Sequence, residues 1–371
     1  MKIQSIGISL IYILLGVMIF QAFLFGKNHL PLFAGGTEFE KESAQSQEEP
    51  LNKWSIPPFD GEKFRYSSLA SLEQVRLLKE WAKAYGYERA RQFLRDVYSD
   101  EPADDHELIH VIGEAAFLKL GYGAFNICDS FFKFGCYHGV VLEAIRQSGY
   151  NQKLLEELAD GCLSLPHSGT TTTACIHGIG HAIMVVRGYD LIPSYEDCDR
   201  MSLDKLASFY CYDGVSMENV VRRHEREGAL DQLYSEDPYY PCNSVPQQYE
   251  AACVREHIFH VRNNFGWKDV DKSAEYCLYF TAEDTLRECF GAMGSAINQD
   301  FSSEPKRVIE ECNKLVTYDP TYRTLCTSTA ATHYSFAQQS QQAEMLCNSL
   351  PDRIDREGCF GAVEYARASL F

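Results

Sequence analysis

The chain has 371 residues, of which 45% are hydrophobic and 23% charged, and its formal net charge at pH 7 is −18. This composition is typical of a folded protein with one large domain or two ordinary ones. The acidic balance argues against nucleic acid as a partner, because a sequence-independent nucleic-acid binder needs a basic surface to displace counterions. It also argues against electrostatic docking on an anionic membrane.

The first segment predicts a membrane anchor. Residues 3–26 carry no charged side chain, and about 20 apolar residues are enough to cross the hydrocarbon core. A cleavable signal peptide is the alternative, but its apolar region is usually shorter and ends at a small-residue cleavage site. We therefore expect residues 1–27 to be a transmembrane signal-anchor. Residues 28–61 are acidic and marked by Pro and Gly, which predicts a flexible linker.

Residues 62–371 predict an all-α domain built from short helices. Ser71 and Gln74 form a capping box, Gly86 ends the run that follows, and no persuasive alternating pattern indicates strands. The cysteines form consecutive pairs whose first members are 34, 36, 44, 35, 35 and 35 residues apart. The pairs are Cys128/Cys136, Cys162/Cys175, Cys198/Cys211, Cys242/Cys253, Cys277/Cys289, Cys312/Cys326 and Cys347/Cys359. This period predicts an αα-hairpin repeat solenoid with repeats of about 35 residues.

Each cysteine pair is expected to form one disulfide inside its repeat. In most units the first cysteine ends a short amphipathic helix and the second opens another, so the bond would join the two helices. Such a bond should stabilise its unit by about 3 kcal/mol in the chain-entropy model. Disulfides imply an oxidising compartment, so we expect the domain to be extracytoplasmic, in the periplasm or at the cell exterior. In period and hairpin logic only, the array resembles tetratricopeptide-type and Sel1-type repeats. The tetratricopeptide Trp/Leu-Gly/Tyr signature is missing, so no functional residue is carried over.

The repeats allow equivalent positions to be compared within one chain. Two residues after the second cysteine, three successive units carry His138, His177 and Asp213. Equivalent positions in stacked helices lie about 8–10 Å apart, so these side chains could converge on one point. In later units this position holds Arg255, Gly291, Ser328 and Gly361. A polar column confined to one half predicts a site half, residues 104–220, and a scaffold half, residues 221–371.

Histidine pairs four residues apart strengthen the prediction of a metal site. His106 and His110, like His177 and His181, would lie on one helix face, where both rings can reach the same cation. Residues 106–110 also read H-E-x-x-H, a zinc-hydrolase motif in which the Glu is the general base on a metal-bound water. The predicted metal ligands are His106, His110, His138, His177, His181 and Asp213. Glu107 is the predicted catalytic base, and Glu114, Glu143 and Glu218 are secondary candidates.

The sequence thus predicts a membrane-anchored extracytoplasmic helical-repeat protein with a His-rich divalent-metal site. Zinc is the first choice of metal and copper the second, because both accept imidazole ligands. If the protein is an enzyme, we expect a metal-dependent hydrolase. The alternative is a non-catalytic solenoid scaffold that binds a protein, peptide or glycan partner on its concave face. The histidines could equally be buried residues that pack helix against helix, and convergence of their rings in space separates these interpretations.

Overall fold

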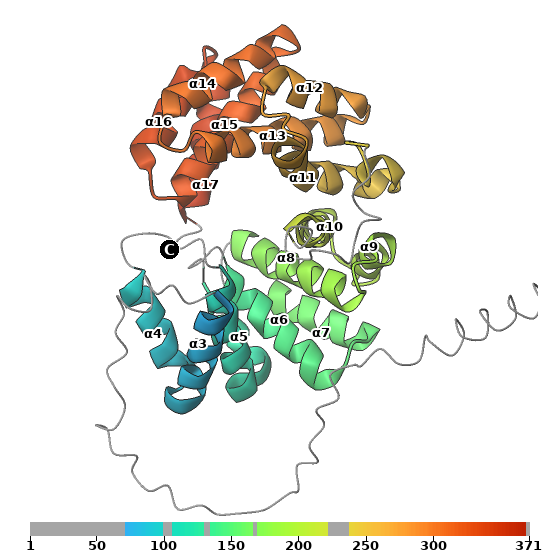
Figure 1. Cartoon of the computed structure of the whole chain (residues 1–371), viewed down its shortest axis with the longest axis vertical. Coiled ribbons are helices and arrows are strands. Elements are labelled where there is room, and N and C mark those ends of the chain that lie inside the picture. Colours follow the sequence, from blue (N-terminus) through green and yellow to red (C-terminus); the bar gives the residue numbers. More distant parts are fainter. Residues whose placement is uncertain (1–70, 99–105, 130–133, 166–168, 222–236, 369–371) are drawn as a thin grey trace, which may run out of the picture. The chain divides into compact units, whose positions relative to one another are not determined.

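The computed structural model describes residues 71–98, 106–129, 134–165, 169–221 and 237–368 (Figure 1). The chain divides into two compact units, Met1–Pro58 and Phe59–Phe371, and every described residue belongs to the second. The expected signal-anchor and most of the linker fall in the first unit and lie outside the described residues. Within the described ranges the chain is all-helical and contains no strand, as the sequence predicted.

The helices follow one another closely along the chain. They are α3 (Ser71–Tyr85), α4 (Tyr87–Val97), α5 (His106–Leu120), η1 (Gly121–Ile127), α6 (Gly135–Ser148), α7 (Gln152–Leu163), α8 (Gly169–Val186), α9 (Leu191–Asp199), α10 (Lys205–Val221), η3 (Cys242–Ser244), α11 (Gln247–Asn264), α12 (Val270–Tyr279), α13 (Glu283–Asp300), α14 (Pro305–Lys314), η4 (Leu315–Thr317), α15 (Pro320–Phe336), α16 (Ser340–Ser349) and α17 (Arg353–Ala368). Here η marks a 3₁₀ helix. Gly86, which has a φ of 87°, separates α3 from α4, because a left-handed backbone cannot continue a helix.

Helices of successive units pack on one another in chain order. Helix α5 packs on α6, α6 on α8, α8 on α10, α10 on α11, α11 on α13, α13 on α15, and α15 on α17. Helices α7, α9, α12, α14 and α16 each pack against the long helices next to them in the chain. The long helices therefore form the continuous part of the stack, and a side chain on one of them can meet its equivalent on the next.

One described segment, Leu108–Ile127, is apolar and long enough to cross a membrane by length and composition. Many of its apolar side chains, however, face other helices, although Leu118 is exposed. Ile109, Ile112 and Ala116 are at most 1% exposed, and they belong to the same hydrophobic core as residues of α6 and α8. The segment therefore serves as a core helix of the domain.

The predicted cysteine pairing is confirmed. All fourteen cysteines form disulfides, each within its own pair, and the bonded residues are 8 to 14 positions apart. The bonds are Cys128–Cys136, Cys162–Cys175, Cys198–Cys211, Cys242–Cys253, Cys277–Cys289, Cys312–Cys326 and Cys347–Cys359. Seven disulfides indicate an oxidising environment for the domain. Each bond links two segments that follow one another in the chain.

The expectation that the second cysteine of each pair opens its helix is wrong for six of the seven pairs. Helix α8 begins at Gly169 and contains Cys175 in its second turn, and α10 begins at Lys205 and contains Cys211 at the same depth. The same offset recurs in the four later units, at Cys253 in α11, Cys289 in α13, Cys326 in α15 and Cys359 in α17.

The start of each helix explains this correction. In α15 the side chain of Asp319 caps the first turn and Pro320 stands at the first position, so the helix begins before Cys326 is reached. Cys136 differs from the other second cysteines, because α6 begins at Gly135 and Cys136 lies in its first turn, as the sequence predicted. After the first unit, each disulfide reaches the second turn of a long helix, and its other cysteine lies near the end of the preceding helix except in the unit of Cys242, which begins η3.

Three pairs of long helices cross at backbone contact distance, and one of them is α13 with α15, where a Cβ atom on Gly294 would lie 2.1 Å from the Cys326 carbonyl oxygen. A Cβ atom on Gly113 of α5 or Gly139 of α6 would lie 2.0 Å from a carbonyl oxygen of the facing helix. Gly180 of α8 and Gly214 of α10 make the same crossing, with distances of 2.1 and 2.0 Å. Any larger residue would force these helices apart, so the glycines set how closely side chains on neighbouring helices approach.

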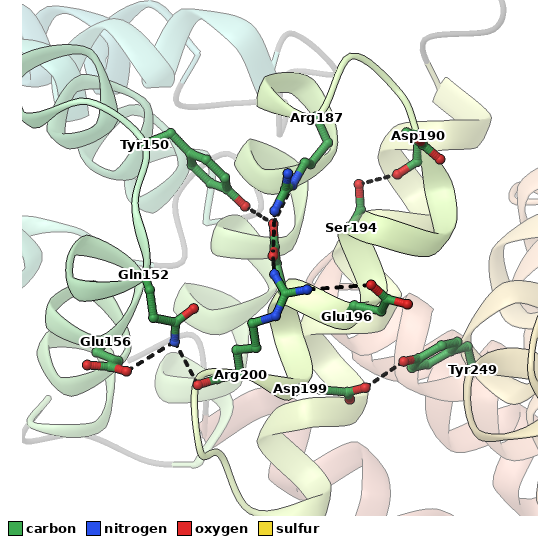
Figure 2. Close-up of polar contacts among 11 residues, drawn as sticks. Tyr150, Gln152, Glu156, Arg187, Asp190, Ser194, Glu196, Asp199, Arg200 and Tyr249 are labelled. Carbon is green, nitrogen blue, oxygen red and sulfur yellow. Dashed lines mark hydrogen bonds and ion pairs between the residues drawn. The ribbon is translucent and has the colours of Figure 1, made fainter.

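A buried ion cluster joins the outer helices. Asp197 of α9 is 1% exposed, and its carboxylate accepts hydrogen bonds from Arg187 at 2.6 and 2.8 Å and further contacts from Tyr150 and Arg200. Figure 2 shows Tyr150, Arg187 and Arg200 converging from three different segments. Because the buried charge is fully paired, this cluster fixes the turn that follows α8.

Candidate metal centre

Three imidazoles meet between α6 and α8. His138, His177 and His181 each offer one ring nitrogen, and these three atoms lie within 4.8 Å of one another. The ring centroids of His138 and His177 are each 4.7 Å from that of His181. His138 is only 5% exposed, and the side chains of His177 and His181 are 15% and 13% exposed. Together the three residues could hold a metal ion.

Buried carboxylates orient two of these rings. Nδ1 of His177 lies 3.2 Å from Asp213, and Nδ1 of His181 lies 2.9 Å from Glu218. A carboxylate only accepts hydrogen bonds, so each Nδ1 carries the proton and donates it. Each ring therefore turns Nε2, with its lone pair, toward the centre of the triad. A carboxylate behind a ligating histidine is the usual outer shell of a metal site.

The two Nε2 atoms lie 2.9 Å apart. With both Nδ1 atoms protonated, two lone pairs would face each other at this distance, and either a proton between the two nitrogens or a metal ion would remove the repulsion. Nitrogen ligands of a tetrahedral zinc ion, at about 2.0–2.1 Å from the metal, are about 3.3 Å apart. The rings would have to separate by only about 0.4 Å to take zinc on this geometry.

A glycine makes room for the third ring. A Cβ atom on Gly178 would lie 2.6 Å from Cδ2 and 3.3 Å from Nε2 of His138. No side chain other than hydrogen fits at this position unless the ring of His138 moves. The sequence Cys175-Ile-His-Gly-Ile-Gly-His181 therefore supplies two ligands, the space for the third, and the glycine that crosses α10.

Further polar groups hold the two carboxylates. The hydroxyl of Tyr189 donates to Oε1 of Glu218 at 3.0 Å. On the other side, Nε of Arg255 lies 3.2 Å from Oδ1 of Asp213, and its Nη1 donates to Glu288 at 2.7 Å. The column that the sequence placed two residues after each second cysteine is thus continuous in space, from His138 to His177, Asp213 and Arg255.

The pKa shifts around the triad concern His181 and the carboxyl groups near Arg255. Burial lowers the pKa of His181, although its hydrogen bond to Glu218 acts in the opposite direction. Burial by itself would raise the pKa of Asp213, but Arg255 and His177 lower it below its usual value. Burial and the neighbouring Asp213 raise the pKa of Glu256 well above its ordinary 4.5, which favours its protonated form. Neutral imidazole is the form that binds a metal.

The other predicted site residues lie beside the triad or outside the described side chains. The ring of His110 is 5.2 Å from that of His138, but His110 is not part of the three-nitrogen group. Asp213 lies behind the ring of His177, on the side away from the triad, and Glu218 lies behind that of His181. His106 and Glu107 stand in the first turn of α5, and their side chains are outside the described part of the chain.

Glu114 and Glu143 make ion pairs of their own. Glu114 lies 2.9 Å from Lys79, and Glu143 lies 2.6 Å from Arg146 and accepts a hydrogen bond from Gln147. Both carboxylates already have cationic or amide partners in this structure, which sets them apart from the two carboxylates that face imidazoles.

Sequence reasoning missed two contributors to the site. Gly178 could have been found from the sequence, because it stands between two histidines four residues apart. A small residue there leaves space for the ring of His138 on the facing helix. Tyr189 carries no such signal. It reaches Glu218 through the turn after α8, where Gly188 and Tyr189 both have positive φ, and a tyrosine gives no sign of that conformation in a sequence.

Comparison with protein-family models, curated proteins and solved structures finds no match for this chain. The class of protein is therefore defined by its own features: an all-helical domain braced by seven disulfides, with a histidine triad that could bind a metal.

Proposed function

We propose that this protein binds a divalent metal ion through His138, His177 and His181, with zinc as the preferred ion and copper as the second choice. One observation carries the proposal: two imidazoles held by buried carboxylates direct their Nε2 atoms at each other across 2.9 Å. Helix packing alone gives no reason for two lone pairs to face each other. A cation between them removes the repulsion and uses every hydrogen-bonding group in its observed orientation.

Three protein ligands also leave room for chemistry. Zinc sites with three protein ligands keep a fourth position for water, and the metal lowers the pKa of that water to near 7. The side chains of His177 and His181 are 15% and 13% exposed, so the triad is not sealed from solvent. On this basis we propose metal-dependent hydrolysis as the activity of the centre. Glu107 is the base proposed from the sequence.

Metal content tests the binding proposal directly. The full-length chain, exported to an oxidising compartment without a histidine tag, should carry about one equivalent of divalent metal by elemental analysis. His138→Ala with His177→Ala should reduce this to background, because one remaining imidazole cannot hold the ion. Circular dichroism should show that the helices of this variant are intact.

A second buried pair provides the matched control. His257 and His260 of α11 are 0% and 3% exposed, with rings 5.0 Å apart, and the described residues around them form no group of three ligands. His257→Ala with His260→Ala should keep the metal. Equal metal content in wild type and the His138/His177 variant would reject the proposed ligands. Loss of metal in both variants would indicate that lost helix packing, and not the loss of ligands, releases the metal.

Activity is tested on the metal-loaded protein. Ester and peptide panels should reveal hydrolysis that a chelator removes and zinc restores, and that His177→Ala abolishes. If the protein binds metal but hydrolyses no substrate class in these panels, it is a metal carrier and the hydrolase proposal is refuted.

We further propose that the stack is a repeat solenoid held at a membrane. The in-order packing of long helices and the common position of the second cysteine support a repeat.

The uncharged residues 3–26 support the anchor. Retention of the full-length chain in the membrane fraction after a carbonate wash, with release after deletion of residues 1–27, would support anchoring. Release of the intact chain by the wash would refute it.

A further inference from the structure

We infer that Tyr189 is a positioning residue of the metal centre, which sets the orientation of His181 through Glu218. The inference rests on the proposed metal site. On this inference Tyr189, which lies outside the triad, keeps His181 in the tautomer that can bind a metal.

The contact chain is short and directional. The Tyr189 hydroxyl donates to Oε1 of Glu218 at 3.0 Å, and Oε2 of the same carboxylate accepts from Nδ1 of His181 at 2.9 Å. Glu218 is 7% exposed, so few water molecules can replace either partner. The hydroxyl thus fixes the rotation of the carboxylate, and the carboxylate fixes the protonated nitrogen of His181. Nε2 is left facing His177.

The backbone of Tyr189 is strained where it places the hydroxyl beside Glu218. Its φ is 67°, in the left-handed region that a bulky residue rarely adopts, and Gly188 before it has a φ of 65°. Two successive residues of this kind close α8 and turn the chain sharply, with the Tyr189 amide bonded to the carbonyl of Met184 at 2.9 Å. Glycine or asparagine would satisfy such a turn with less strain, but neither carries a hydroxyl that reaches Glu218. Strain of this kind persists where the surrounding structure requires it, often at functional sites.

A second tyrosine provides a matched comparison. Tyr150, labelled in Figure 2, also donates its hydroxyl to a buried carboxylate, that of Asp197. Tyr150 and Tyr189 are both partly buried. The partners of Asp197 are Tyr150, Arg187 and Arg200, and none of them is in the triad. The same deletion of one oxygen can therefore be made inside and outside the centre.

The test is a competition titration with Zn²⁺ and a chromophoric chelator on the full-length chain. Tyr189→Phe keeps the ring and removes only the hydroxyl, and loss of such an outer partner typically weakens metal binding about 10–100-fold. Tyr150→Phe should bind Zn²⁺ like wild type. Thermal unfolding of the metal-free proteins should show a similar small shift for both variants.

A double-mutant comparison shows whether Tyr189 acts through Glu218. In a Glu218→Ala background the accepting oxygen is gone, so adding Tyr189→Phe should change the Zn²⁺ affinity less than about two-fold. Wild-type affinity in Tyr189→Phe, an equal loss in Tyr150→Phe, or an undiminished effect of Tyr189→Phe beside Glu218→Ala would each overturn the inference. Failure of the wild-type chain to bind Zn²⁺ at all would instead refute the proposed metal site.

Discussion

Replacing Gly178 by alanine tests whether the position of the His138 ring determines metal affinity. The new Cβ would lie 2.6 Å from Cδ2 of that ring, whereas carbon atoms pack at about 3.5–4.0 Å. The ring must therefore move by about 1 Å, which exceeds the tolerance of about 0.5 Å for a functional constellation. We expect the affinity for Zn²⁺ to fall on the order of 100-fold, as for other misplacements of this size.

The stability of the metal-free protein should change much less. Inside a helix, alanine is favoured over glycine by about 1 kcal/mol, and this gain offsets part of the cost of moving the ring. Gly180→Ala is the matched control, because it lies two residues further along α8. Its Cβ would stand 2.1 Å from the Cys211 carbonyl oxygen and 2.9 Å from the Val215 amide nitrogen, where no flexible side chain can yield. That variant should lose about 3 kcal/mol or more of unfolding free energy.

Two measurements separate these effects. Chelator competition gives the Zn²⁺ dissociation constant, and urea unfolding followed by circular dichroism gives the free energy of unfolding. If Gly178→Ala binds Zn²⁺ as tightly as wild type while the fold is intact, His138 is not a ligand. If it unfolds as readily as Gly180→Ala, the space beside His138 serves packing and the reasoning from the ring is wrong.

Three more predictions follow from the charges and disulfides around the triad. Because burial lowers the pKa of His181, the unfolded chain binds more protons than the folded one just below pH 6.5. Stability of the metal-free protein should therefore rise with pH through that window, and His181→Asn should lack this part of the slope in urea unfolding. Because the pKa of Glu256 is raised, the folded chain holds a proton above pH 4.5 that the unfolded chain has lost, so this group makes stability fall as pH rises. Glu256→Gln should therefore be at least as stable as wild type at pH 7. Asp213→Asn should lower the free energy of unfolding by about 3 kcal/mol, because it breaks a buried pair. If urea unfolding gave the reverse order of stability, the directions of the two pKa shifts would be contradicted. Cys162→Ser with Cys175→Ser should lower the unfolding free energy by about 3 kcal/mol, and a loss below about 1 kcal/mol would show that stacking alone holds the unit.

Patterns in the sequence were enough to predict that the described residues are all-helical and how their cysteines pair. The spacing of cysteines predicted the helix pairs and all seven disulfides, because a bond within each unit is the simplest pattern that a 35-residue period allows. The helix start before Cys175 was misplaced because the Thr-rich residues 170–174 have weak helix propensity, and the start before Cys326 because Pro320 disfavours a helix interior. Caps and packing override that propensity, and the sequence carries little sign of it.

The candidate site could be predicted only in part, and the reason is geometric. Equivalent positions in a repeat identify which residues share a column, and these rings are indeed neighbours. The orientation of each ring is not encoded by position, because it depends on carboxylates from the next helix. Asp213 and Glu218 have the same chemistry as metal ligands, and only the coordinates place them behind the imidazoles. Tyr189 depends on a strained turn that no composition rule anticipates.

The charge around the triad favours a dication over a proton. Asp213 and Glu218 face the triad with two negative charges, while the charge of Arg255 is shared with Glu288. A single shared proton between His177 and His181 would neutralise one of the two. A divalent ion carries one more positive charge, and at about 6 Å and an effective dielectric constant of about 20 each carboxylate attracts that charge by about 3 kcal/mol. Both carboxylates therefore attract a dication more strongly than a shared proton, which is a reason for acidic partners to lie behind both imidazoles.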